Sequence, residues 1–240
     1  MNSFGTIFKL AILSGVHIGF GAYLAMTVGG ACAGIASSNP GLQKMIFGAF
    51  GLPFGLIMTL VTGGELFTGN TMLVTAAVRE GKATFSQLRK SLISSFLGNF
   101  AGSLLLASLV HVAGTLGPTS AASSIATAKC SMAFKVAFTR GVLCNFLVAT
   151  AVYMASGVST LGAKMVAVWF PISAFVALGL DHSVANMFII PLGMLSGAAD
   201  VTIKSFLLGN LLPVTLGNIV GGGCFVALAF GNIFGKKKDE

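Results

Sequence analysis

Long apolar runs alternate with short charged segments along the chain, and six of these runs reach the length of a membrane span. A spanning helix needs about 20 mainly apolar residues. The runs lie at about residues 7–35, from 45 with an interruption near Glu65, 88–112, 133–156, from 165 with an interruption at 179–183, and 205–234. This pattern predicts an all-α membrane protein with six transmembrane helices, of which the second and the fifth are broken.

The composition agrees with a protein that lies in a lipid bilayer. Hydrophobic residues make up 55% of the 240 residues and charged residues only 8%, whereas soluble domains carry about 25% charged residues. The net charge of +8 comes from short basic patches between apolar runs. These patches indicate topology, and we expect no nucleic-acid partner.

The basic residues also predict the orientation of the chain. Counted on alternate sides of the six spans, Lys and Arg number nine on the side of the N-terminus and five on the other, and Lys236–Lys238 belong to the larger set. Because the cytoplasmic side holds the excess of basic residues, both termini are expected in the cytoplasm. We expect the plasma membrane as the location.

The cysteines give no sign of a metal site or of a disulfide framework. They show no C-x-x-C spacing and mostly lie inside apolar runs, at Cys32, Cys130, Cys144 and Cys224. Free cysteine behaves as a small buried side chain. We therefore expect no metal, no cofactor and no catalytic residue, and the protein is not expected to be an enzyme.

An internal repeat divides the chain. The sequence Gly-Asn-Phe-Ala-Gly at 98–102 recurs as Gly-Asn-Ile-Val-Gly at 217–221, and its asparagines are 119 residues apart (218 − 99). The interruptions at Glu65 and His182 are 117 apart (182 − 65). Residues 1–240 are thus predicted to form one transmembrane domain from two inverted three-helix halves, about 1–118 and 119–240. Alternatively, the short match is only a helix-packing motif of small residues.

The two interruptions concentrate the polar chemistry of the apolar chain. The first, at 62–70, contains Glu65 and Thr68, and the second, at 178–193, contains Asp181, His182 and Asn186. An ionisable group at membrane depth costs about 2.5 to 3.5 kcal/mol. Non-helical backbone survives there only where protein buries it or where it lines a wet cavity. The interruptions therefore predict a transport pathway, and the N-termini of the half-helices favour an anion within it.

Four segments carry a resemblance to a known family. Gly-Gly-Glu-Leu-Phe-Thr-Gly at 63–69, Leu-Cys-Asn-Phe-Leu-Val at 143–148, Asp-His-Ser-Val-Ala-Asn-Met at 181–187 and Pro-Val-Thr-Leu-Gly-Asn-Ile-Val-Gly-Gly at 213–222 resemble the formate/nitrite transporter family, and the similarity extends over about residues 5–235. The resemblance implies an aquaporin-like fold and a homopentamer with one pore in each protomer. It also implies a small monovalent weak-acid substrate such as formate or nitrite, with acetate and lactate as further possibilities.

The same resemblance implies roles for individual residues. His182 matches the central pore histidine, and Thr68 matches the threonine that faces it. Asn145 matches an asparagine near that histidine, and Asn186 matches an asparagine one turn after it. Lys129 matches the lysine of the outer vestibule. The outer constriction maps to Phe67, Val148 and Phe175, and the inner one to Leu52 and Leu56. Leu52 replaces a phenylalanine of some formate channels, which leaves the pore width open.

Several of these residues also have simpler interpretations. His182 could be a core histidine that a backbone carbonyl satisfies, and Thr68 could cap the helix after it. Asp181 is expected to cap the half-helix that begins near Ser183, because Asp at that position satisfies free amides. Glu65 could be a cap, a link within its loop or a substrate contact. Lys129 could be a topology charge alone.

Two mechanisms and two other protein classes stay open. Proton-coupled transport would use His182, since an unperturbed histidine titrates at about pH 6.5. Alternatively, the anion itself passes, driven by the membrane potential. A membrane redox protein could use His17, His111 and His182 as haem ligands, although their spacing is not paired. A structural membrane subunit would not need two polar interruptions at matching places.

Overall fold

The computed structural model describes residues 2–116 and 121–235, and this part of the chain folds into helices without any strand. Within it, five stretches are long and apolar enough to span a membrane: Phe4–Ala31, Pro40–Thr62, Phe85–Ala113, Phe134–Ser156 and Ser205–Phe234. The count of six spans remains a prediction. The basic segment Lys236–Lys238 and the expected boundary near residue 118 lie outside the described residues.

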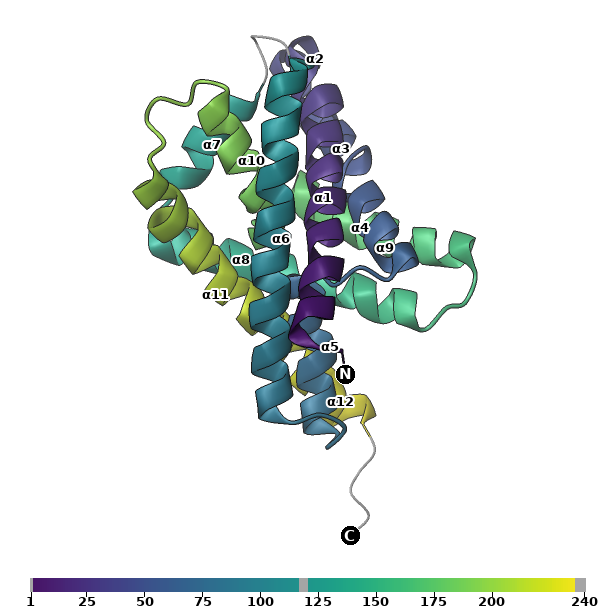
Figure 1. Ribbon diagram of the computed structural model, residues 1–240. Helices are drawn as coiled ribbons and strands as arrows, with labels where there is room; N and C mark the ends of the chain where they lie inside the picture. Colours follow the sequence, from purple (N-terminus) through teal and green to yellow (C-terminus); the bar gives the residue numbers. More distant parts are fainter. Residues whose placement is uncertain (1, 117–120, 236–240) are drawn as a thin grey trace.

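The described residues form a succession of helices joined by short segments. In chain order they are α1 (Phe4–Val28), η1 (Gly29–Ala31), α2 (Ala33–Ser38), α3 (Pro40–Ala49), α4 (Leu52–Thr62), α5 (Phe67–Arg79), α6 (Phe85–Ala113), α7 (Ala122–Cys130), α8 (Phe134–Ser156), α9 (Leu161–Ala177), α10 (Ser183–Leu195), η2 (Ser205–Leu211), α11 (Leu212–Ile219), η3 (Val220–Leu228) and α12 (Ala229–Phe234). The start of α1 and the end of α12 lie at the same end of the molecule (Figure 1).

The two long helices α1 and α6 pack side by side over most of their length (Figure 1). Their backbones approach closely because glycine occupies the contact positions. A Cβ atom at Gly15 would collide with the carbonyl of Asn99, and one at Gly102 with the carbonyl of Ile12. Small residues at such crossings let membrane helices gain van der Waals contact.

The helices are interrupted at the two positions that the sequence predicts. Helix α4 ends at Thr62 and α5 begins at Phe67, while α9 ends at Ala177 and α10 begins at Ser183. Each interruption starts at a glycine in the left-handed region, Gly63 with φ 74° and Gly179 with φ 70°. Other residues rarely adopt this conformation, so glycine ends the helix there.

Two buried asparagines hold the interruptions with matching hydrogen bonds. The Oδ1 of Asn99 accepts from the N–H of Phe67 at 2.9 Å, and its Nδ2 donates to the carbonyls of Ala11 and Glu65 at 2.8 and 3.0 Å. These bonds fasten the start of α5 to α1 and α6. The side chain therefore satisfies the backbone polar groups that the break exposes.

Asn218 performs the same task at the second interruption. Its Oδ1 accepts from the N–H of Ser183 at 2.8 Å, and its Nδ2 donates to the carbonyls of Gly141 and Asp181 at 2.8 and 3.1 Å. Asp181 follows Glu65 by 116 residues (181 − 65), and the same separation joins Gly63 to Gly179. The equivalence thus pairs Glu65 with Asp181, whereas the sequence analysis had paired it with His182.

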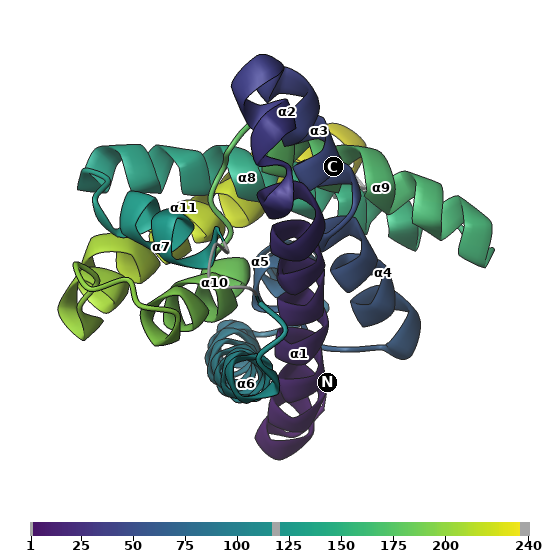
Figure 2. The same cartoon turned by 90° about the horizontal axis from the view of Figure 1, so that it is seen from above.

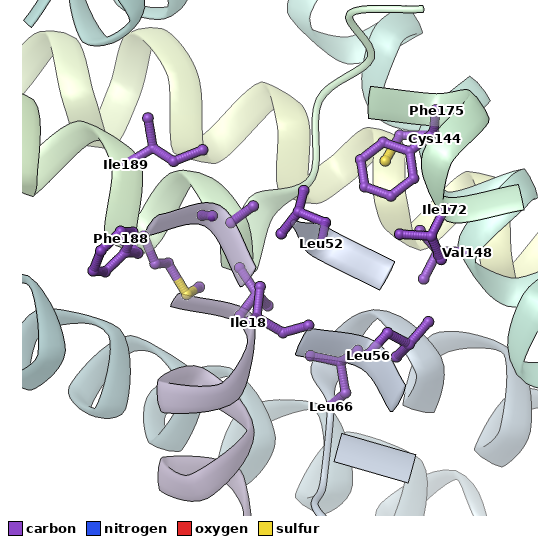
Figure 3. Packing of buried hydrophobic residues seen from close by; sticks show 14 of the residues in the cluster. Ile18, Leu52, Leu56, Leu66, Cys144, Val148, Ile172, Phe175, Phe188 and Ile189 are labelled. Atoms are coloured by element: carbon purple, nitrogen blue, oxygen red, sulfur yellow. The ribbon is translucent and has the colours of Figure 1, made fainter. Parts of the chain in front are cut away.

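The apolar core lies where both interruptions meet the packed helices. Seen from above, α9 extends to one side of α1, and α8 with α11 extends to the other (Figure 2). Ile18, Leu56, Val148, Ile172 and Phe175 point toward a common centre from α1, α4, α8 and α9 (Figure 3). All five are at most 3% exposed. The polar side chains Thr68, Asp181 and His182 beside this core are buried in protein as well, as a membrane interior requires.

Candidate functional site

Thr68 and His182 join the two interruptions at the centre of the molecule. The Oγ1 of Thr68 lies 2.9 Å from the Nε2 of His182, and both side chains are buried. Thr68 is the second residue of α5, and His182 directly precedes α10. This contact brings the N-terminal ends of the two half-helices together, as the resemblance implies for these two residues.

His182 is also the residue that caps α10. Its Nδ1 accepts a hydrogen bond from the N–H of Ala185 at 3.1 Å. Because Nδ1 acts as an acceptor, the neutral ring carries its proton on Nε2 and donates it to Thr68. The hydroxyl of Thr68 then keeps its own hydrogen for another acceptor.

The ends of the half-helices make this centre favourable for negative charge. A helix N-terminus carries about half a positive elementary charge, and α5 and α10 both begin within a few residues of the Thr68–His182 contact. Uncompensated amides at such ends bind anions. The helix ends therefore give the centre positive potential. The N–H groups of Phe67, Ser183 and Ala185 already have side-chain acceptors, so the hydroxyl of Thr68 is the donor left for a ligand.

An apolar chamber adjoins His182 on one side. Its volume is about 10 Å³, and its other lining residues are Ile18, Leu52, Leu56, Leu66, Val148, Ile172 and Phe175. The ring of Phe175 stacks on that of His182, with centroids 5.9 Å apart and an interplanar angle of 26°. Since about 10 to 15 Å³ admits one water molecule, the chamber is a constriction.

A larger cavity, here called the vestibule, lies on the other side of His182. It has a volume of about 250 Å³, and Lys129, Arg140 and Asn186 line it together with apolar side chains. Leu52, Phe175 and His182 line both this vestibule and the apolar chamber. These three residues therefore separate the two spaces.

The structure groups the constriction residues differently from the sequence analysis. Leu52 lies beside Phe175 at the vestibule, whereas the sequence analysis placed it in an inner constriction. Val148 and Leu56 line the chamber. Phe67 packs edge-on against Phe96, with centroids 5.2 Å apart. Among the described residues, neither cavity has Phe67 in its lining, and the proposed outer set of Phe67, Val148 and Phe175 is not brought together.

The expected capping role of Asp181 is wrong. Its Oδ1 accepts from the Nζ of Lys129 at 2.6 Å and from the Nδ2 of Asn186 at 3.0 Å. The side chain is 1% exposed, so the carboxylate needs a charged partner in the protein. His182, one residue later, takes the capping position instead. Lys129 is thus an ion-pair partner as well as a vestibule residue.

Asn186 extends this network to a residue that the sequence analysis missed. Its Nδ2 also donates to the Oδ1 of Asn210 at 2.8 Å, and the Nδ2 of Asn210 donates to the carbonyl of Lys129 at 2.9 Å. Asn210 lies in the π-helical segment η2, a type of irregularity that is frequent at functional sites. The bonds close a ring that fixes Lys129 beside Asp181.

Asn145 supports the central contact from behind. Its Nδ2 donates to the carbonyls of Thr68 and Asn218 at 3.2 and 2.6 Å and lies 2.9 Å from the Oγ1 of Thr71. The Oδ1 of Asn145 is buried and has no hydrogen-bond partner among the described residues. The side chain therefore positions the backbone of Thr68, and a free acceptor remains beside it.

Glu65 forms a link within its own segment. Its Oε2 accepts from the Nδ2 of Asn70 at 2.7 Å, and Asn70 also donates to the Oγ of Ser91 at 3.2 Å. This arrangement parallels Asp181 with Asn186. Of the three interpretations of Glu65, the structure shows the link within its own interruption, through Asn70.

The chain is similar over nearly its whole length to known proteins. The family model for formate/nitrite transporters matches residues 1–231. A probable formate transporter of Methanothermobacter thermautotrophicus is 40% identical, over 94% of this chain and 88% of its own length. The nitrite transporter NirC of Escherichia coli is 36% identical, over 91% of this chain and 80% of its own length. A solved structure described as a pentameric formate channel with formate bound superposes with a TM-score of 0.84 at 30% sequence identity. The superposition covers 97% of this chain and 98% of that one.

Proposed function

Since the chain belongs to the formate/nitrite transporter family, we propose that it passes a small monovalent weak acid, formate or nitrite, between the vestibule and the apolar chamber. The observation that carries the proposal is the Thr68–His182 contact, which joins two helix N-termini between these spaces. A neutral solute would not need this concentration of positive potential.

The arrangement supports the following path. Basic residues of the vestibule attract the anion and raise its local concentration. Beyond Leu52 and Phe175 the lining is apolar, and a bare charge there would lose several kcal/mol of hydration. The Thr68 hydroxyl, which accepts from the Nε2–H of His182 and keeps its own hydrogen, is the polar donor that meets the substrate oxygens at this point. This hydrogen bond offsets part of the hydration that the substrate loses.

We propose that protonation removes the remaining barrier. A carboxylic acid with a pKa of about 4 is almost wholly ionised at pH 7, yet its neutral form crosses an apolar constriction without the charge penalty. His182 lies where the vestibule meets the chamber and is the titratable group that lines both. Proton coupling through His182 is therefore favoured over passage of the bare anion. Acetate and lactate are larger candidate substrates of the same chemistry.

The same reasoning extends to the architecture and assembly. The matching bonds of Asn99 and Asn218 support two inverted halves within one domain. The solved relative is described as pentameric, and a homopentamer is the assembly that we propose here. Both ends of the helical domain lie on one side in Figure 1, which suits two cytoplasmic termini at the plasma membrane.

The mechanism predicts a pH dependence of uptake. In proteoliposomes, the rate of radiolabelled formate uptake is expected to rise as the external pH falls from about 7.5 to 5.5, because the neutral acid becomes more abundant. The assay should compare formate, nitrite, acetate and lactate at both pH values, with empty liposomes as the control for direct membrane permeation. A rate that follows the membrane potential and ignores pH would instead establish passage of the bare anion.

The width of the boundary between vestibule and chamber should determine substrate size. Leu52→Ala removes three side-chain carbons from the lining that the two spaces share, so the ratio of lactate to formate uptake is expected to rise about tenfold. Leu212→Ala, at an exposed leucine of α11, is the matched control. The measurement is the lactate-to-formate uptake ratio of both variants in parallel liposome preparations. An unchanged ratio in Leu52→Ala would show that another residue sets the limit on substrate size.

A further inference from the structure

Two basic side chains line the vestibule, and they pair unequally with the buried carboxylate of Asp181. The Nζ of Lys129 lies 2.6 Å from the Oδ1 of Asp181, whereas the Nη1 of Arg140 lies 4.0 Å from Oδ2. The longer distance exceeds hydrogen-bonding range. Lys129 therefore makes the close, hydrogen-bonded ion pair with Asp181, and Arg140 makes a longer one. The three groups together leave one positive charge in the described vestibule lining, and Arg140 is the less tightly paired of the two cations.

The guanidinium of Arg140 is also available to a ligand. Its side chain is 46% exposed, against 19% for Lys129. Within the described residues, its hydrogen bond is from Nη1 to the Sδ of Met132 at 3.1 Å. Thioether sulfur is a weak acceptor, and arginine has five N–H donors in a planar fork. Arg140 therefore lines the cavity with donor capacity that its hydrogen bond to Met132 does not use.

The backbone fixes where Arg140 stands. Its carbonyl lies 3.5 Å from the N–H of Asp181, which ties α8 to the second interruption. The next carbonyl, that of Gly141, accepts from Asn218 at 2.8 Å. Arg140 is therefore anchored beside His182 even though its side chain reaches into open space.

We propose that Arg140 is the anion-binding residue of the vestibule and that Lys129 is a positioning residue that acts through Asp181. The proposal rests on the proposed function. Formate and nitrite each present two oxygens on one central atom, and a guanidinium binds such a pair in a bidentate manner. The anion is held at Arg140 before it passes Leu52 and Phe175.

These two roles predict different effects when Arg140 or Lys129 is replaced. Loss of Arg140 removes the binding site alone. Loss of Lys129 leaves the buried carboxylate of Asp181 without its partner, and the vestibule then gains an uncompensated negative charge. A Lys129 variant should therefore recover when Asp181 is neutralised as well, whereas an Arg140 variant should not.

The test is the concentration dependence of radiolabelled formate uptake into proteoliposomes. At low ionic strength, Arg140→Gln is expected to raise the half-saturating concentration about tenfold while the maximal rate stays the same, since steering by one charge is lost. Arg140→Lys should give an intermediate value, because lysine keeps the charge and lacks the fork. The difference between Arg140→Gln and the unmodified protein should shrink near 1 M salt.

Two controls keep the result specific. Lys135→Gln removes an exposed charge from the same helix, outside the vestibule lining, and should leave uptake unchanged. The pair Lys129→Gln and Lys129→Gln/Asp181→Asn tests positioning, and the double variant should regain the half-saturating concentration of the unmodified protein. Elution of every variant at the same volume in size-exclusion chromatography establishes that assembly is intact.

The outcomes separate this proposal from the one it rests on. Unmodified protein that takes up neither formate nor nitrite overturns both. Active unmodified protein with an unchanged half-saturating concentration in Arg140→Gln overturns the role of Arg140 alone. Recovery that fails in an assembled Lys129→Gln/Asp181→Asn variant overturns the positioning role of Lys129.

Discussion

His182→Phe is expected to reduce formate uptake to the background of empty liposomes. Phenylalanine fills a similar volume, but it removes the Nε2–H donor and the Nδ1 acceptor from a chamber whose other lining is apolar. Hydrogen bonds to a charged group contribute about 1.5 to 3 kcal/mol. Because Thr68 also loses its hydrogen bond to His182, we expect the rate of formate uptake to fall about 100-fold or more. Radiolabelled formate flux in proteoliposomes is the measurement.

The substitution also removes a helix cap, so its control must keep one. Loss of a capping side chain costs about 1 kcal/mol of stability, and His182→Asn retains a good capping residue without a titratable ring. The Asn variant should assemble normally and take up formate more slowly, and the pH dependence that remains should follow the abundance of the neutral acid alone. If the Phe variant transported at the unmodified rate, the central role of His182 would be refuted.

Asn218→Leu should have the largest effect on stability. The side chain is fully buried, and its loss leaves the N–H of Ser183 and the carbonyls of Gly141 and Asp181 without their partner. Each buried group left unsatisfied costs about 1 to 3 kcal/mol. We expect a loss of about 3 to 5 kcal/mol, seen as a much lower midpoint of thermal unfolding in detergent.

Two further variants show whether this effect is specific to the interruptions. Asn99→Leu should destabilise to a similar extent, because Asn99 makes the corresponding bonds at the first interruption. Asn232→Leu, at an exposed asparagine that accepts from Arg79, should cost less than about 1 kcal/mol. Equal unfolding midpoints for all three variants would contradict the assigned role of the two asparagines.

The breaks in the helices could be predicted because their signal is local. Glycine at 63 and 179 ends a helix through its own backbone freedom, and a polar group in a long apolar run is visible in the sequence. Run length and composition likewise predicted helices of membrane-spanning length. The repeat stays a prediction from the Gly-Asn motifs, and the spacing of Gly63 and Gly179 matches Glu65 with Asp181 rather than with His182.

The partners of the charged groups could not be predicted in the same way. Asp181 was expected to cap α10 because it stands near its start, yet it pairs with Lys129, which precedes it by 52 residues. A buried carboxylate takes the best available cation, and only the packing of α7 against α10 brings that cation within reach. The adjacent His182 then takes the cap.

The sequence by itself determined the class of fold, the two interruptions and the chemistry gathered there, because hydrophobic run length and glycine conformation are properties of neighbouring residues. Only the tertiary structure decided that Leu52 lines the same cavities as Phe175 and that Asp181 pairs closely with Lys129 and at longer range with Arg140. Those relations depend on distances between separate helices. Hydrogen bonds and packing contacts form only within a few ångströms, and the Coulomb energy varies inversely with distance, so helix packing settles them.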